Sequence, residues 1–175
     1  MSLPTKKRII LTKEKCQVII NSLQEKLIDL TNLNDIIWFI VDFISKNTGY
    51  VDLVIYLYDD KQGTLIQRAA IGTKRNDNQM VINPIQIEPG EGIVGRAFIS
   101  GLPRIIGDTS LDTNYIIDDR YRSSEISIPI FDKSDKDTTI GIIDSEHTSE
   151  NFYTAFDQFL LTEVAEIISK KIPID

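Results

Sequence analysis

The sequence predicts an α+β fold, with a central antiparallel sheet and its helices segregated on one face. Two stretches, 51–71 and 124–146, are rich in branched and aromatic residues and are each interrupted by a polar turn, which is typical of a β-hairpin. Amphipathic helical patterns precede the first hairpin and follow the second. Strands and helices are thus grouped along the chain instead of alternating, as parallel α/β folds require.

Two helices are expected before the first strand. In the first, apolar residues recur at steps of four and three; they are Cys16, Ile20, Leu23, Leu27 and Leu30. This spacing is that of a coiled-coil seam, and equally that of one amphipathic helix packed on its own domain. Residues 1–32 are therefore expected to be a leading helix, either in a dimer seam or packed on the domain formed by 33–175. The second helix begins near Asn34 and ends at Gly49, and its Trp38 is expected to be core or interface.

The remaining elements follow from local patterns and turn residues. Strands are expected at 51–58, 64–71, 82–87, 104–106, 124–131 and 139–146. Prolines near the third of these suit an edge strand or an irregular entry. A short helix is expected over Gly92–Ser100, and a final helix from a Thr154 cap to about Ile172. The polar segment between the two hairpins is expected to be irregular, with a helical turn around 115–119.

Composition limits the chemistry of the chain. It has 175 residues, 42% hydrophobic and 26% charged, which suits one globular domain with its own core. Cys16 is the only cysteine and His147 the only histidine. This excludes a disulfide framework and most metal and nucleophilic sites, so we expect no metal and no cofactor. Because His147 lies in a polar DSEHTSE context, a solvated side chain is favoured over haem ligation.

Charge and hydropathy limit the partners. A net charge of −7 and a pI near 4.8 argue against a nucleic-acid partner, which requires a basic surface. The longest uncharged run, 78–87, is far too short to span a membrane. The start, MSLPTKKR, lacks the apolar core of a secretory signal. We expect a cytoplasmic chain, or a cytoplasmic part of a larger one, with no direct membrane contact.

The stretch GEGIVG, residues 90–95, has the G-x-G-x-x-G spacing of dinucleotide-binding loops. Such a loop must lie between a strand and a full crossover helix inside a parallel βαβ unit. Here the helix ends within two or three turns and no parallel partner strand follows, so the context excludes a dinucleotide site. Two interpretations stay open: the glycines allow close packing of the short helix, or their backbone amides contact a ligand.

Four blocks in order carry a family resemblance: EPGEGIVGRAFISGLPRIIGDTSLDTNY, RSSEISIPI, IGIIDSEH and the final helix FxxFDxxLLxxVAxII. Together they resemble a GAF domain over about 33–172, especially GAF modules upstream of bacterial sensor histidine kinases. The resemblance implies a GAF-type central antiparallel sheet with the N- and C-terminal helices on one face. It also implies a lid over the other face, formed by the short helix and the loop 107–123, which encloses a small-molecule pocket.

One branch of GAF proteins reduces free methionine-R-sulfoxide with a pocket cysteine, and the sequence is similar to that branch in its acids. Glu125, Asp144 and Glu146 match acidic residues that hold the substrate's ammonium group. Val94 and Asp118, however, stand where that branch has thiols. Since a thiolate is the reductant, the chain is not expected to be an enzyme.

The acids allow two interpretations. They could line a pocket that selects a cationic or amine-bearing ligand, or they could bond backbone amides at strand ends and face water. Arg120, Arg122 and Asp108 could likewise clamp an anion or form surface ion pairs. The residues expected to line the pocket are Tyr56, Gly92, Val94, Asp108, Tyr115, Asp118, Ser124, Glu125, Asp144 and Glu146.

The function that these observations favour is a sensory module. It is expected to bind an unknown small molecule, to form a homodimer and to regulate an output domain, such as a histidine kinase, through its terminal helices. The alternative is a dimerisation or protein-interaction module that binds no ligand. Because the sequence ends in KKIPID just after the last helix, where a signalling helix would continue, we expect a piece of a larger kinase or cyclase.

Overall fold

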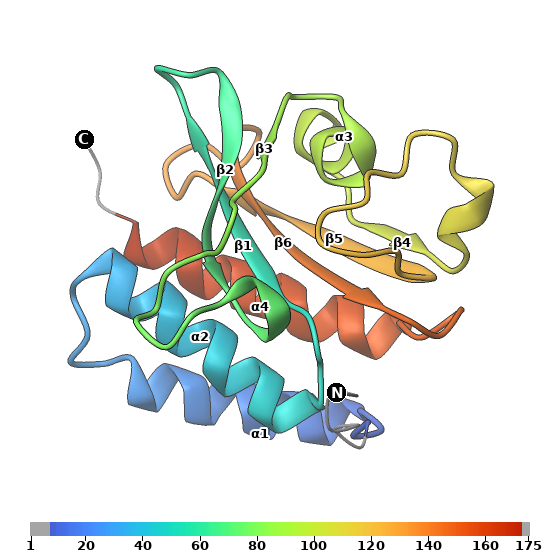
Figure 1. Ribbon diagram of the computed structural model, residues 1–175. Helices are drawn as coiled ribbons and strands as arrows, with labels where there is room; N and C mark the ends of the chain where they lie inside the picture. Colours follow the sequence, from blue (N-terminus) through green and yellow to red (C-terminus); the bar gives the residue numbers. More distant parts are fainter. Residues whose placement is uncertain (1–7, 173–175) are drawn as a thin grey trace.

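The computed structural model describes residues 8–172. In chain order the elements are α1 (Lys13–Lys26), α2 (Leu33–Thr48), β1 (Val54–Asp59), β2 (Thr64–Ala70), η1 (Gly72–Lys74), β3 (Gln86–Ile87), α3 (Gly92–Ser100), β4 (Arg104–Ile106), η2 (Thr109–Leu111), β5 (Ser124–Phe131), β6 (Thr139–His147) and α4 (Ala155–Lys171). Helices α1, α2 and α4 lie on one face of the sheet, and α3 lies on the other (Figure 1).

The strands form one antiparallel sheet in the order β3-β2-β1-β6-β5-β4. The two hairpins, β1–β2 and β5–β6, join through the β1–β6 pair, which confirms the α+β class. The third strand is much shorter than expected and is an edge strand, as its prolines suggested. Asn83 has a positive φ of 47° and the next residue, Pro84, has no N–H group, so the chain turns before it can pair with β2.

The buried apolar residues of α1 pack against the core of the same chain. Their side chains belong to the same core as α2, α4 and the sheet, and Leu23 is fully buried. The Nζ atom of Lys171 in α4 donates to the carbonyl of Leu27 at 2.7 Å, which ties the ends of α4 and α1 together. The coiled-coil interpretation of these residues is corrected accordingly: the helix is amphipathic because it packs on its own domain. Trp38 of α2 is buried in the same core.

Residues 107–123, which we call the lid, cover the opposite face of the sheet together with α3 (Figure 1). The glycines of GEGIVG allow this packing. A Cβ atom on Gly92, whose φ is +60°, would lie 2.8 Å from Cδ1 of Ile116 in the lid. A Cβ atom on Gly95 would overlap the carbonyl oxygen of Glu88. The structural interpretation of these two glycines therefore accounts for their positions.

The lid is irregular, as expected, but its helical turn is at Thr109–Leu111 and not at 115–119. The side chain of Asp108 accepts a hydrogen bond from the amide of Ser110 at 2.9 Å and so caps this turn. The predicted cap of α4 is confirmed: Thr154 and Asp157 form a reciprocal capping box. None of the helices between residues 8 and 172 has both the length and the apolar character that a bilayer crossing requires.

Candidate ligand site

The strand register places the predicted acids on one face of the sheet. In the β5–β6 pair, Glu125 lies opposite Glu146, and Ser127 lies opposite Asp144. Residues that are directly opposite in a sheet point to the same side, and so do residues two apart along a strand. The lid residue Tyr115 donates from Oη to Oε1 of Glu146 at 2.7 Å, so this is the face that the lid covers.

These acids are buried and bonded to side chains. Glu125, Asp144 and Glu146 are each at most 6% exposed. The hydroxyl of Ser127 lies within hydrogen-bond distance of both Asp144 and Glu125. The interpretation that these groups face water is therefore wrong, because opposite partners on the strands and the lid above enclose them.

Burial raises the pKa of all three carboxyl groups, and neighbouring negative charge raises it further. The pKa of Glu146 rises to about 9, through burial and the charges of Asp144 and Asp52. Burial raises the pKa of Asp144 to about 7, although its hydrogen bond from Ser127 acts in the opposite direction. For Glu125 the rise is also large, and its causes are burial, Asp144 and Glu146 in that order. The cluster therefore retains protons near neutral pH unless a cation enters it.

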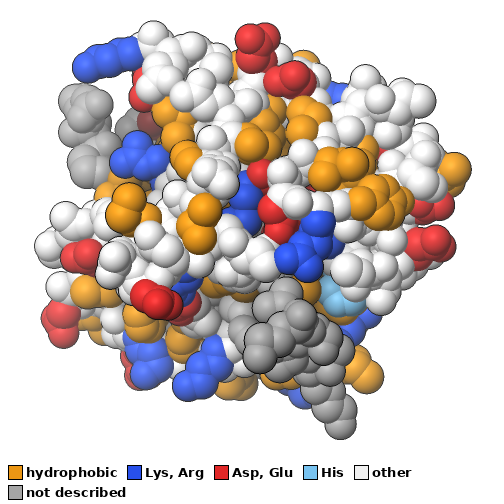
Figure 2. Space-filling model, viewed as in Figure 1, with side chains coloured by type: hydrophobic (Ala, Val, Ile, Leu, Met, Phe, Trp, Pro, Cys, Tyr) orange, Lys and Arg blue, Asp and Glu red, His pale blue; other side chains and the backbone are white. Residues whose placement is uncertain are grey.

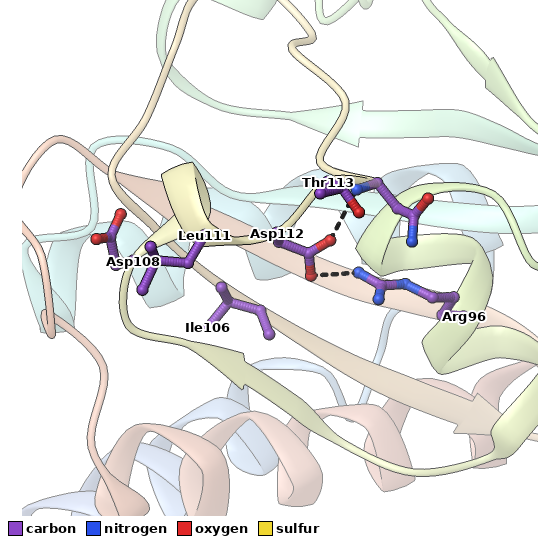
Figure 3. A pocket seen from close by; sticks show the side chains of 7 residues that line it. Arg96, Ile106, Asp108, Leu111, Asp112 and Thr113 are labelled. Carbon is purple, nitrogen blue, oxygen red and sulfur yellow. Dashed lines mark hydrogen bonds and ion pairs between the residues drawn. The ribbon is translucent and has the colours of Figure 1, made fainter.

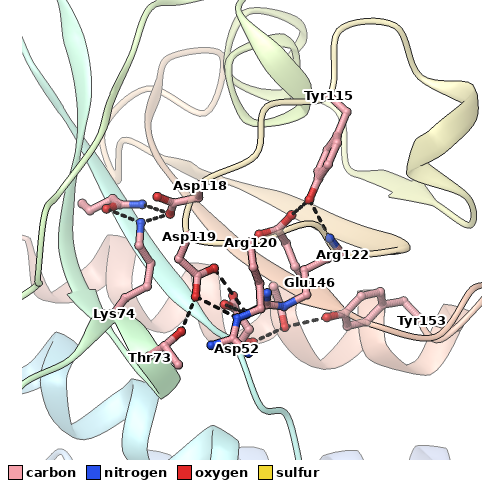
Figure 4. A network of polar contacts seen from close by, with 12 residues as sticks. Asp52, Thr73, Lys74, Tyr115, Asp118, Asp119, Arg120, Arg122, Glu146 and Tyr153 are labelled. Atoms are coloured by element: carbon pink, nitrogen blue, oxygen red, sulfur yellow. Dashed lines mark hydrogen bonds and ion pairs between the residues drawn. The ribbon is translucent and has the colours of Figure 1, made fainter.

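Lid residues close over the cluster through a buried ion pair (Figure 4). Nη2 of Arg122 lies 3.3 Å from Oδ2 of Asp52 and 3.4 Å from Oδ1 of Asp119. Burial raises the pKa of Asp52 to about 6, while the Arg122 charge lowers it. Within residues 8–172, Oδ1 of Asp52 and Nη1 of Arg122 are buried without a hydrogen-bond partner. Both atoms therefore have hydrogen-bonding capacity that the described residues do not use.

A second set of contacts holds the other part of the lid. Lys74 of η1 forms a buried ion pair with Asp118, and its neighbour Thr73 bonds to Asp119 (Figure 4). Nζ of Lys74 also donates to Oε1 of Gln67 at 2.9 Å. Burial lowers the pKa of Lys74, although nearby acids act in the opposite direction. On the face shown in Figure 2, acidic and basic side chains lie next to one another near the centre, bordered by hydrophobic ones.

The first part of the lid borders a separate, open surface hollow of about 370 Å³ (Figure 3). It is lined by Arg96, Ile106, Asp108, Leu111, Asp112, Thr113 and Asn114. Arg96 of α3 pairs with Asp112, which fixes α3 to the lid. The side-chain hydrogen bond from Arg96 contributes to a lowered pKa of Asp112, against the effect of burial. This hollow contains none of the buried acids.

The structure brings together six of the ten predicted site residues: Tyr56, Tyr115, Asp118, Glu125, Asp144 and Glu146. The other four lie elsewhere. Gly92 contacts the lid, Val94 packs in the apolar cluster on this face, and Asp108 lines the separate hollow. Ser124 points to the opposite face, because it precedes Glu125 in the strand, and it donates to the carbonyl of Ser149 at 2.7 Å.

The single cysteine and the single histidine lie away from the acids. Cys16 is fully buried in α1, and its Sγ is 3.6 Å from the carbonyl oxygen of Phe156. His147 stacks on Phe152 with ring centroids 3.6 Å apart, and its Nδ1 accepts from the amide of Ser149. Burial lowers the pKa of His147. Among the described residues, no group of three or more His, Cys, Asp or Glu side chains is arranged to hold a metal ion.

The sequence analysis missed several members of the network, among them Asp52, Gln67 and Lys74. It named Arg122 only as an anion clamp or a surface ion pair, whereas Arg122 is buried against Asp52. Gln67 carried a weak signal, because it is a polar residue inside a predicted strand, two residues from the apolar Leu65. Lys74 had none, since it lies in a polar loop and is buried only by the lid.

The comparisons with known proteins agree with the fold. A family model described as GAF domain matches residues 31–172. The chain belongs to the GAF domain family. GAF domains are common sensory and regulatory modules, and the fold predicted from the four sequence blocks is confirmed.

Solved GAF structures share the fold at low identity. A free methionine-R-sulfoxide reductase from Neisseria meningitidis, solved with its substrate, matches with a TM-score of 0.78, 19% identity and 95% of each chain covered. The GAF domain of a phosphoenolpyruvate-protein phosphotransferase from Coxiella burnetii matches with a TM-score of 0.78, 15% identity, 90% of this chain and 92% of that chain. Among curated proteins, Protein YtsP of Bacillus subtilis (strain 168) is 29% identical over 106 residues. That alignment spans 57% of this chain and 63% of YtsP.

Proposed function

We propose that this GAF domain is a sensory module that binds a small molecule carrying a protonated amine beneath the lid. The observation that carries the proposal is the imbalance of buried charge. Among residues 8–172, four carboxyl groups, those of Asp52, Glu125, Asp144 and Glu146, are buried on this side together with two basic side chains, those of Lys74 and Arg122. Both basic groups are also engaged by lid carboxylates, so the four acids have no full complement of positive charge.

A cation in the cluster would supply the missing charge. Because burial raises the pKa of Asp144 to about 7 and that of Glu146 to about 9, these groups hold protons at neutral pH in the absence of a ligand. An ammonium group that binds between them favours the ionised acids and displaces these protons. Binding should therefore release protons at pH 7. The chain is similar in fold to a reductase whose substrate, methionine-R-sulfoxide, is a free amino acid derivative. This similarity supports an amine ligand of about the size of a free amino acid.

Calorimetric titration tests this proposal. Free amino acids, including methionine and its R-sulfoxide, and simple primary amines are titrated at pH 7 in buffers of different ionisation enthalpy. We expect binding with proton release that is reduced in the Asp144→Asn and Glu146→Gln variants and unchanged in a Glu25→Gln control at an exposed site on α1. The absence of binding by every amine, or binding without proton release, would contradict the proposal.

We also propose that the module does not reduce methionine sulfoxide. The cluster is lined by carboxyl, hydroxyl and amide groups, and Cys16 is fully buried on the helix-covered side of the sheet. A thiolate close to the substrate is needed as the electron donor. We expect no turnover of free methionine-R-sulfoxide with thioredoxin or dithiothreitol. Turnover that survives in a Cys16→Ser variant would overturn this statement and reveal another reductant.

A chain of contacts supports an output through the terminal helices. Asp52, which pairs with the lid, accepts at its carbonyl from the hydroxyl of Ser145. That hydroxyl lies 2.7 Å from Oη of Tyr153, whose ring packs edge-on against Tyr50 at 5.7 Å. Tyr50 donates to Oδ1 of Asp157 in the first turn of α4 at 2.6 Å. If ligand binding acts on α4 by this route, amide exchange in its first turn should slow when an amine binds, together with exchange in the lid.

The alternative function, a protein-interaction module that forms a homodimer, is supported by one feature of α1. Val18 on this helix is 68% exposed and Ile28, in the turn just after it, is 69% exposed, whereas Leu23 faces the core. Each lies beside a shallow, mainly apolar groove of about 300 Å³. Light scattering separates the two functions, because a Val18→Glu variant should dissociate an α1-mediated dimer without changing amine binding.

A further inference from the structure

The side-chain amide of Gln67 connects the sheet, the lid and η1, and all its hydrogen-bonding positions are used. Oε1 accepts from Nζ of Lys74 at 2.9 Å and from the amide of Ile85 at 3.1 Å. Nε2 donates to Oδ2 of Asp118 at 2.6 Å and to Oη of Tyr56 at 2.8 Å. A primary amide has two donors and a carbonyl oxygen with two lone pairs, so this side chain, only 4% exposed, is fully satisfied.

Three of these partners fix the orientation of the amide. The Lys74 ammonium and the Ile85 backbone amide can only donate, and the Asp118 carboxylate can only accept. Rotating the amide by 180° would place two N–H groups against the donors and the carbonyl oxygen against the carboxylate. The amide orientation is therefore determined by its neighbours, and its N–H group must face Tyr56.

This orientation determines the role of the Tyr56 hydroxyl. Because Tyr56 accepts from Gln67, its own proton points in another direction. Tyr56 is 2% exposed, and burial, Asp144 and two further acids raise its pKa well above the usual value, so the proton is retained. In β1 it stands two residues from Val54, which lies opposite Asp144, so its ring is on the same face as the acids. Within residues 8–172, the structure shows no hydrogen bond that this hydroxyl donates.

We infer that Gln67 is a positioning residue for ligand selection: it makes Tyr56 a hydrogen-bond donor beside the acid cluster. The site then selects amines that carry a hydrogen-bond acceptor, such as an ether, carbonyl or carboxylate oxygen, a few bonds from the ammonium group. Lys74 contributes to the same arrangement, because its ammonium group helps to orient the Gln67 amide. This inference rests on the amine site of the proposed function and adds the second group that the ligand presents.

Matched amines test this selectivity. Two pairs differ only by oxygen in place of one methylene: 2-methoxyethylamine against n-butylamine, and 3-methoxypropylamine against n-pentylamine. We expect the wild-type protein to bind the ether of at least one pair about three- to tenfold more tightly, the size of one net hydrogen bond. The preference should disappear in Tyr56→Phe, which has no hydroxyl. It should also disappear in Gln67→Glu, where the introduced carboxylate accepts the Tyr56 proton. Gln86→Glu, the same change at an exposed site in β3, should keep it.

A second readout requires no ligand. The C–O stretching vibration of a tyrosine differs between hydroxyls that accept a hydrogen bond and those that donate one. Infrared spectra are recorded on protein with isotope-labelled tyrosine, and the Tyr56 band is assigned by its loss in Tyr56→Phe. In the wild type, the band should be that of a hydroxyl that accepts a hydrogen bond. In Gln67→Glu, it should be that of a hydroxyl that donates one and accepts none. If no amine binds, the proposed function fails while this spectrum still decides the hydroxyl's role. A donor signature in the wild type, or an ether preference unchanged in Gln67→Glu and Tyr56→Phe, overturns the inference.

Discussion

Neutralising Glu146 should make the protein more stable in mildly alkaline solution. In the Glu146→Gln variant, the amide oxygen can still accept the hydrogen bond that Tyr115 donates at 2.7 Å, and the shape of the side chain hardly changes. What changes is the cost of ionisation. Burial raises the pKa of Glu146 from an ordinary value of 4.5 to about 9, so between these values the folded chain holds a proton that the unfolded chain has lost. Stability must then fall as pH rises through this window.

The magnitude follows from that difference. One group that is protonated only in the folded state lowers the free energy of unfolding by about 1.4 kcal/mol for each pH unit. From pH 7 to pH 9, Glu146 alone accounts for at most about 2.7 kcal/mol, and about 2 kcal/mol is expected because the charge of Asp144 shares the titration. His147, whose pKa is lowered by burial, acts below this range.

Urea unfolding at pH 7, 8 and 9 measures this slope. Trp38 is 2% exposed and is the only tryptophan, so its fluorescence reports the transition. Wild type and the exposed control Glu25→Gln should lose stability in parallel across these points, and Glu146→Gln should lose about 2 kcal/mol less. Equal slopes for the wild type and Glu146→Gln would show that Glu146 is already ionised in the folded protein, and the charge argument for a cationic ligand would lose its basis.

Two further predictions concern the fold. Gly95→Ala should destabilise the protein by about 2 kcal/mol or more in thermal unfolding, because its Cβ would overlap the Glu88 carbonyl. Gly63→Ala should cost only about 1 kcal/mol, because Gly63 has a φ of +69° but nothing within 4 Å of the added Cβ. Equal losses would contradict the packing role of GEGIVG. Leu23→Ala should lower the free energy of unfolding in urea by about 2–5 kcal/mol, because Leu23 is fully buried. Val18→Ala should lower it by less than about 0.5 kcal/mol, because Val18 is 68% exposed. A larger loss for Val18→Ala that depends on protein concentration would place α1 in a dimer interface.

Elements that depend on local patterns could be predicted from the sequence. Helix α3 was predicted with its bounds, because glycines on both sides define a nine-residue helix. The cap at Thr154 was predicted because its partner Asp157 is only three residues away. For β3 the local pattern misled, since a run of branched residues at 81–87 resembles a strand while Pro84 prevents most of its pairing.

The candidate site was predictable only in part, because its acids and their partners carry different signals. Asp144 and Glu146 alternate along a strand, and the GAF resemblance gave them a role. The other charged groups of the site come from distant segments: Asp52 is 70 residues from the arginine with which it pairs. Lys74 precedes Asp118 by 44 residues, in a loop whose composition is that of a solvated turn. No periodicity relates such residues, so only the tertiary fold shows that they meet.

The Asp118 position supports the proposal that this site recognises a ligand without redox chemistry. The resemblance to sulfoxide-reducing GAF proteins implies a thiol here, where a reductant must be free to attack the substrate. In this chain the position carries a carboxylate that bonds to Lys74 and Gln67, and through Gln67 it helps to hold the Tyr56 hydroxyl as a donor. A group fixed by two partners orients its neighbours instead of reacting. Asp118→Cys should therefore disturb the amide orientation of Gln67 and reduce amine selectivity, without conferring reductase activity unless a resolving thiol is supplied beside it.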